Sequence, residues 1–111
     1  MMSSKDIAKV KRKIEATKGE LCFKFVDSNY QTYNGVVMVP GDIHEMSCIP
    51  VVCKQGIHYS QKLSTLKKMY PHAKAEGMHC LIVMPIGTVE YDQETDIGAT
   101  NKLYILAEYP L

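Results

Sequence analysis

The sequence lacks the features that would direct the chain into a membrane or out of the cell. No apolar run is long enough to cross a bilayer, and the first residues lead into a charged segment without the apolar core of a signal peptide. We therefore expect a cytoplasmic protein with no membrane partner. The sequence also contains no internal repeat and no low-complexity tract, so residues 1–111 are predicted to form a single domain.

The common motifs for nucleotides, hydrolysis and calcium are absent as well. The seven glycines are dispersed, and there is no G-x-x-x-x-G-K-[ST], G-x-G-x-x-G, G-x-S-x-G or H-E-x-x-H motif. Asp92, Glu94 and Asp96 have the alternate spacing of calcium ligands, but Ile97 stands where the sharp turn of a calcium loop needs glycine. We therefore predict no cofactor.

The few cysteines and histidines have poor spacing for a metal site. Cys48-x4-Cys53-x4-His58 is the best combination, whereas structural zinc sites favour cysteines two to four residues apart on tight turns. If residues 48–53 form a strand, Cys48 and Cys53 point to opposite faces. We predict no metal site.

A thiol nucleophile is an open alternative, in which Cys53 or Cys80 is activated by His58, His72 or His79. Such a site needs a base within hydrogen-bonding reach, which sequence spacing alone does not show. His79 and Cys80 are neighbours on a predicted strand and so point apart. We therefore favour reduced, inert thiols in the core for all four cysteines, Cys22, Cys48, Cys53 and Cys80.

The apolar run His79–Ile86 is the strongest structural signal. It is short, β-branched in the middle and closed by Gly77 and Gly87, which is typical of a strand buried on both faces in the middle of a sheet. Pro85 has no N–H to donate, so regular pairing is expected to stop there.

The remaining pattern predicts an α+β fold. Asn34–Gly35 is interpreted as a bulge within a strand at 30–39, or alternatively as a hairpin turn. The expected order is α-β-β-β-α-β-β, with about five strands in one mixed or antiparallel sheet and both helices on one face. The predicted helices cover 5–18 and 60–70, and the predicted strands cover 20–27, 30–39, 48–54, 79–86 and 102–109.

Charge is unevenly distributed although the formal net charge is only +1. The predicted first helix carries a basic ridge formed by Lys5, Lys9, Arg12 and Lys13. Such a ridge fits a phosphate backbone, and it fits an acidic partner or a simple solvated helix face equally well. Nucleic-acid binding through this ridge is therefore an alternative function.

Acidic residues gather near the other end of the chain. Residues 87–101 show little apolar periodicity and are predicted to form a long loop, although Thr88–Tyr91 is also compatible with a strand. Long loops in compact domains tend to be functional, and this one is predicted to contact a protein partner. Its acidic residues are Glu90, Asp92, Glu94 and Asp96.

The predicted strand at 102–109 is apolar on both faces. Leu103, Ile105 and Ala107 are expected on one face, with Tyr104 and Leu106 on the other. Only one face can rest on the helices of a two-layer fold, so Tyr104 and Leu106 are predicted to form an oligomer interface, by default that of a homodimer.

Together these patterns predict a small binding module that acts by protein–protein contacts and has no catalytic activity. Its size and lack of motifs suggest an inhibitor or adaptor such as phages and mobile elements encode. The alternatives are the nucleic-acid-binding protein and the small Cys/His-dependent enzyme described above.

Overall fold

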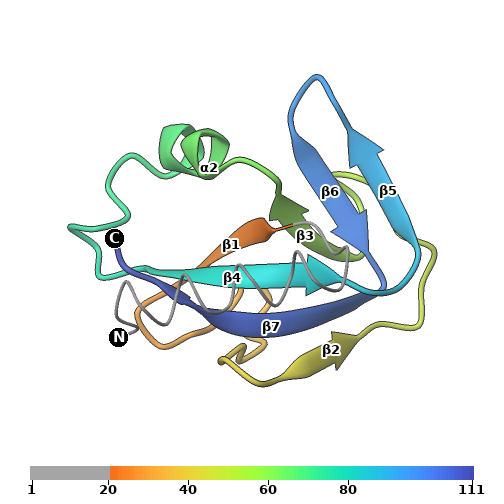
Figure 1. The fold of residues 1–111 in the computed structure, drawn as a ribbon, viewed down its shortest axis with the longest axis horizontal. Helices are drawn as coiled ribbons and strands as arrows, with labels where there is room; N and C mark the ends of the chain where they lie inside the picture. The colour runs from red at the N-terminus through yellow and green to blue at the C-terminus, as the bar shows by residue number, and fades with distance from the viewer. Residues whose placement is uncertain (1–20) are drawn as a thin grey trace.

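The computed structural model describes residues 21–111, which form one antiparallel sheet and one short helix (Figure 1). The elements in chain order are β1 (Cys22–Val26), β2 (Ile43–Glu45), β3 (Ile57–Ser60), α2 (Leu63–Met69), β4 (His79–Pro85), β5 (Val89–Asp92), β6 (Ile97–Thr100) and β7 (Lys102–Tyr109). In the sheet the strand order is β2-β7-β4-β1-β3-β6-β5. Within these residues, no helix has the length and apolar character needed to cross a membrane.

The prediction of an α+β fold with about five strands is wrong. The sheet has seven strands, all paired antiparallel, and α2 is the only helix among the described residues, so this part of the chain is mostly β. The predicted first helix, 5–18, lies outside the described residues. The strands β2, β3 and β6 were missed, and each has only three or four residues, while β5 corresponds to the alternative strand at Thr88–Tyr91.

The prediction that the run at 79–86 is a buried inner strand is confirmed. β4 lies between β7 and β1, and its side chains enter two separate apolar clusters on opposite faces of the sheet. Leu81 and Val83 belong to the first cluster, whereas Cys80 and Ile82 belong to the second, and all four are fully buried. The strand ends at Pro85, as predicted.

Two predicted strands do not form. The chain instead makes a tight turn at Thr32–Val36, in which Thr32 N–H donates to Val36 O and Gly35, with φ of +78°, donates to Thr32 O. Asn34–Gly35 is therefore a turn and not a bulge. Residues 48–54 form a loop with a single bridge between Val51 and Gln55, and the strand begins only at Ile57.

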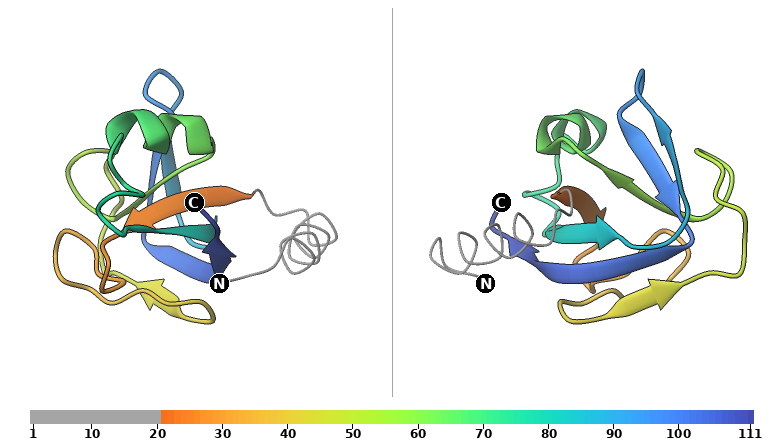
Figure 2. Two further views of the ribbon diagram at one scale, coloured as in Figure 1. Left: turned by 90° about the vertical axis from the view of Figure 1, so that its left-hand side faces the viewer. Right: turned by 45° about the vertical axis from the view of Figure 1, so that its right-hand side comes forward.

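The sheet divides between β1 and β3. β1 and β4 are paired along five residues, from Cys22↔Val83 to Val26↔His79, whereas β1 and β3 share the single pair Phe23↔Ser60. We call β2, β7, β4 and β1 the four-stranded part and β3, β6 and β5 the three-stranded part. In Figure 2 the β5–β6 hairpin stands at a steep angle to β4 and β7, so the sheet opens beyond the shared pair.

Asp96 connects α2 to the three-stranded part. Its Oδ2 accepts hydrogen bonds from Ser60 Oγ at 2.7 Å, from the backbone N–H of Lys62 at 3.1 Å and from Thr65 Oγ1 at 2.9 Å. The carboxylate thus satisfies the N–H of Lys62, the residue just before the helix, and holds the hydroxyl of Thr65 in the first helical turn. Ser60, predicted to open the helix, ends β3 instead, and the helix begins at Leu63.

Candidate functional site

Two cavities lie where the four-stranded and three-stranded parts separate. The smaller, of about 320 Å³, has walls from β1, β3 and α2, and the larger, of about 480 Å³, extends to the turn at 32–36. Both are lined by Lys24, Phe25, His58 and Tyr70, so the two cavities are neighbours that share these walls, and we call the pair the cleft. Volumes of this order hold a small ligand or a side chain inserted by a partner.

Lys24 stands at the junction of the two cavities. On β1 it lies on the same face as Cys22 and Val26, two buried residues of the first apolar cluster. Its Nζ donates a hydrogen bond of 2.7 Å to the carbonyl oxygen of His58, across the gap where main-chain pairing between β1 and β3 has stopped. Burial lowers the pKa of Lys24 to about 8.

No carboxylate within residues 21–111 forms an ion pair with Lys24. Glu45, which also lines the larger cavity, pairs with Lys102 at 3.6 Å across β2 and β7. Because a partly buried ammonium without an opposite charge loses hydration and gains little in return, Lys24 is an energetic cost to the fold. The cleft therefore has a positive centre within largely apolar walls.

His58 forms a neutral wall of the cleft beside Lys24. Its Nε2 accepts the backbone N–H of Cys53 at 2.8 Å, and its Nδ1 lies 3.2 Å from the carbonyl oxygen of Gly56, which places the ring proton on Nδ1. The pKa of His58 is lowered by burial and by the positive charge of Lys24, against the raising effect of the bond to Gly56. Both ring nitrogens are thus committed to the backbone.

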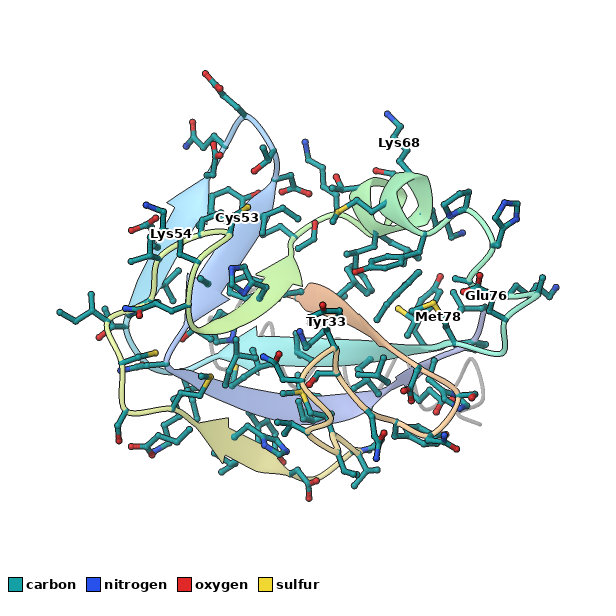
Figure 3. The ribbon with its side chains drawn as sticks, turned by 180° about the vertical axis from the view of Figure 1, so that it is seen from behind. Tyr33, Cys53, Lys54, Lys68, Glu76 and Met78 are labelled. Carbon is teal, nitrogen blue, oxygen red and sulfur yellow. The ribbon has the colours of Figure 1, made fainter. Side chains whose placement is uncertain are left out.

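Apolar side chains are exposed around the mouth of the larger cavity. Tyr33 is fully exposed at the tip of the turn, and Val36 and Met46 are each 42% exposed and line the same cavity. We call Tyr33, Val36 and Met46 the rim. Figure 3 shows Tyr33 on the turn in front of the sheet, and Cys53 and Lys54 in the loop that leads to β3.

The cysteines do not form an activated thiol site. Cys80 is fully buried, and this burial raises the pKa of its thiol to about 12. Cys53 is exposed at a φ of +64°, and the His58 nitrogen that would serve as its base accepts its backbone N–H instead. The core prediction is right for Cys22 and Cys80 and wrong for Cys53, while Cys48 is partly exposed. Within the described part of the chain, no three His, Cys, Asp or Glu residues converge as metal ligands.

A second polar cluster joins the ends of β4 and β7. The rings of Tyr30 and His79 stack at 3.8 Å, and both contact Glu108, with Tyr30 Oη donating to Oε1 and His79 Nδ1 lying 3.4 Å from it. The hydrogen bond to Glu108 is the main cause of a raised Tyr30 pKa. His79 Nε2 lies 3.3 Å from the carbonyl oxygen of Ser28. These contacts attach the loop after β1 to the sheet, which is a structural role.

The predicted acidic loop is a β-hairpin, formed by β5 and β6. Glu90 is exposed, and its Oε1 accepts the backbone N–H of Val52 at 3.1 Å. Asp92 Oδ1 accepts the backbone N–H of Glu94 at 3.0 Å, which shapes the hairpin turn. Asp96 is buried in the contacts to α2 described above. Contact of this hairpin with a partner stays a prediction.

A β-bulge changes the face that the end of β7 presents. Ile82 pairs with Ala107 but Val83 pairs with Ile105, so Leu106 is an extra residue. Ile105 therefore belongs to the first apolar cluster, whereas Ala107 belongs to the second, against which Leu106 packs partly buried. The expected strict alternation to Ala107 is thus wrong.

Tyr104 lies before the bulge, partly buried and opposite Met84 and the 55% exposed Ile43. The dimer interface at Tyr104 and Leu106 stays a prediction. The basic ridge of Lys5, Lys9, Arg12 and Lys13 lies outside the described residues.

Sequence reasoning missed the cleft because its walls come from segments far apart in the chain. One local signal was present. Cys22, Lys24 and Val26 stand at every second position of a strand, so a charged residue shares a strand face with two apolar residues. A comparison with known protein families, with curated proteins and with solved structures finds no match to this chain.

Proposed function

We propose that this protein is a non-enzymatic binding module whose protein partner docks over the rim and places a side chain in the cleft. The observation that carries the proposal is the fully exposed ring of Tyr33 beside a cavity of about 480 Å³. Single exposed apolar residues are ordinary on protein surfaces, but here Tyr33, Val36 and Met46 surround one hollow. Binding without chemistry is the mode of an inhibitor or an adaptor.

The turn presents Tyr33 in a fixed position. Thr32 holds both sides of the turn, because its N–H donates to Val36 O, its carbonyl accepts Gly35 N–H and its Oγ1 accepts Val36 N–H at 3.2 Å. A preorganised tyrosine loses little conformational entropy on binding, and tyrosines are common anchors of protein interfaces. This geometry favours Tyr33 as the residue that dominates partner affinity.

Co-purification from the native host followed by mass spectrometry tests the proposal. We expect a protein that is captured by the wild type and lost with Tyr33→Ala. Ile49→Ala is the matched control, since Ile49 is 77% exposed but lines neither cavity. Capture that survives Tyr33→Ala, or that Ile49→Ala weakens equally, would contradict docking at the rim. Recovery of nucleic acid that depends on Lys9 and Arg12 would favour the alternative function.

A further inference from the structure

We propose that Lys24 recognises a carboxylate, attached to an apolar group, on the protein segment that enters the cleft. The inference rests on the proposed function for the source of the carboxylate. It rests on the cleft itself for the chemistry.

The charge in the cleft is unbalanced and accessible. Lys24 borders both cavities, and its Nζ is bonded to the His58 carbonyl, which is a neutral acceptor. An ammonium has three N–H donors, so one carbonyl does not satisfy it. Among residues 21–111, Glu45 is the one carboxylate that lines either cavity, and it is paired with Lys102. A ligand that brings its own negative charge would remove the cost of burying this ammonium.

The residues that line the two cavities indicate which chemical group accompanies the carboxylate of the ligand. The smaller cavity is bordered by Phe25, Leu66, Met69 and Ile97, and the larger by Val36, Met38, Met46 and Ile57. Both sets are apolar, and they lie on either side of Lys24. A ligand that fills them therefore carries an apolar group next to its anionic group.

A carboxylate fits this site better than a phosphate does. A phosphate carries up to two charges and is bound through several N–H donors, often from arginine. The cleft offers one partly buried positive charge, that of Lys24, beside a neutral His58, because the other lysine at the smaller cavity, Lys54, is exposed to solvent. The structure describes no arginine, since the one arginine of the chain is Arg12. One carboxylate balances one ammonium.

The test uses simple probes on the full-length, ¹⁵N-labelled protein. Hexanoate, hexan-1-ol and hexylamine are titrated separately while backbone amide shifts are recorded by NMR. A capped tripeptide of leucine, glutamate and leucine is compared with its glutamine counterpart in the same way. Lys24→Met and Lys24→Gln remove the charge, and Lys68→Met is the control, because Lys68 is exposed on α2 and lines neither cavity.

We expect hexanoate to shift the amides of Lys24, Phe25 and His58 and to bind at least about tenfold more tightly than hexan-1-ol, as one charge-assisted hydrogen bond provides. Hexylamine should bind most weakly. Both Lys24 variants should bind hexanoate and hexan-1-ol equally, and Lys68→Met should behave as the wild type. The glutamate peptide should bind more tightly than the glutamine peptide in the wild type and in Lys68→Met, but not in the Lys24 variants.

Equal affinity for hexanoate and hexan-1-ol, a preference that survives both Lys24 variants, or no amide shifts with any probe would overturn the inference. Binding of hexanoate but of neither peptide would overturn the protein source and point to a small-molecule carboxylate. A partner captured through Tyr33 together with equal affinities for the two probes leaves the proposed function standing without this inference. A preference for hexanoate over hexan-1-ol without any Tyr33-dependent partner would support the carboxylate site and contradict the proposed function.

Discussion

The four-stranded and three-stranded parts of the sheet are built from the same antiparallel pairing but are stabilised differently. β4 and its neighbours bury apolar side chains on both faces, including the fully buried Leu81, Ile82, Leu103 and Ile105. The three-stranded part has short strands, adds Ile57 and Tyr59 to the first apolar cluster, and is also held by the polar contacts of Asp96 with Ser60 and Thr65. The first part supplies most of the core, whereas the second joins it through β3.

The difference explains why the cleft lies between the two parts. Main-chain pairing between β1 and β3 ends after Phe23↔Ser60, and the Lys24 side chain then replaces a backbone donor for His58 O. Where two pieces of sheet diverge, side chains from both line the space between them. A binding site at such a junction combines a rigid wall with one of lower local stability.

The largest expected effect is on the core of the four-stranded part. Leu81→Ala should lower the free energy of unfolding by about 2 to 5 kcal/mol, because Leu81 is fully buried between β1 and β7 and its removal leaves a cavity. Urea denaturation measures the loss. Ile49→Ala at an exposed site should change it little. A loss for Leu81→Ala as small as that of the control would show that this core is not the main source of stability.

Asp96 tests the polar attachment of the three-stranded part. Asp96→Ala should cost about 3 kcal/mol, because three donors, of which Ser60 Oγ is buried, lose their acceptor and alanine is strained at a φ of +57°. Asp96→Asn, which tolerates that φ and keeps an acceptor, should cost less. Hydrogen exchange should speed up in β3 and β6 before it does in β4 and β7. Uniform loss of protection would mean that the two parts unfold as one.

Gly98 tests the packing within the three-stranded part. A Cβ at Gly98 would lie 2.4 Å from Cζ of the Tyr59 ring, its partner across β3 and β6. Gly98→Ala should therefore displace Tyr59 and destabilise the protein by about 2 kcal/mol, as overpacking in a core does. Thermal unfolding measures this change. Gly41→Ala is a useful contrast, because a Cβ at Gly41 meets no atom within 4 Å and any loss there reflects only its φ of +97°.

The smallest expected effect is a gain in stability when Lys24 is removed. The pKa of Lys24 falls from 10.5 to about 8 on folding, so its charged form opposes folding. The shift corresponds to roughly 3 kcal/mol, which the partial exposure of the side chain reduces. Lys24→Met should thus be more stable than the wild type by about 1 to 2 kcal/mol at pH 7.

This advantage has a defined pH dependence. Between the folded pKa of about 8 and the unfolded pKa of 10.5, the unfolded wild type binds more protons than the folded wild type. Its stability therefore rises with increasing pH relative to the stability of Lys24→Met. The gap should narrow over that range and stay constant below it. Comparing the two proteins at each pH removes the contribution of the groups that they share, including those that also line the cleft. A gap independent of pH would contradict a buried charge at Lys24.

The two parts also differ in how far the sequence predicts them. β4 and β7 were predicted because a long apolar run and a long alternating run carry their own signal. β2 is exposed at two of its three positions and β5 at two of its four, so neither shows the period of a half-buried strand. The apolar segment at 48–54 resembled a strand, but Cys53 adopts a left-handed φ that breaks the extended backbone. β6 is buried at all four positions, but four residues are too few to show a period.

The cleft was less predictable than the fold. The sequence places Lys24 on the less apolar face of β1, where a lysine normally faces solvent. That face turned out to hold the first apolar cluster, because the turn at 32–36 and β3 cover it. Such coverage depends on contacts between residues more than thirty positions apart, such as Lys24 with His58. Local patterns do not contain this information.

The most direct measurement is the titration of the Lys24 amine itself. With lysine labelled with ¹³C at Cε and ¹⁵N at Nζ, and with Lys24→Met to identify the signal, NMR follows the Lys24 side chain across the alkaline range. We predict a midpoint near pH 8 in the free protein, and a higher one with hexanoate in the cleft, because a bound carboxylate favours the ammonium form. Hexan-1-ol should not raise the midpoint. An ordinary midpoint near 10.5 that hexanoate leaves unchanged would contradict a buried, unpaired Lys24 that recognises a carboxylate.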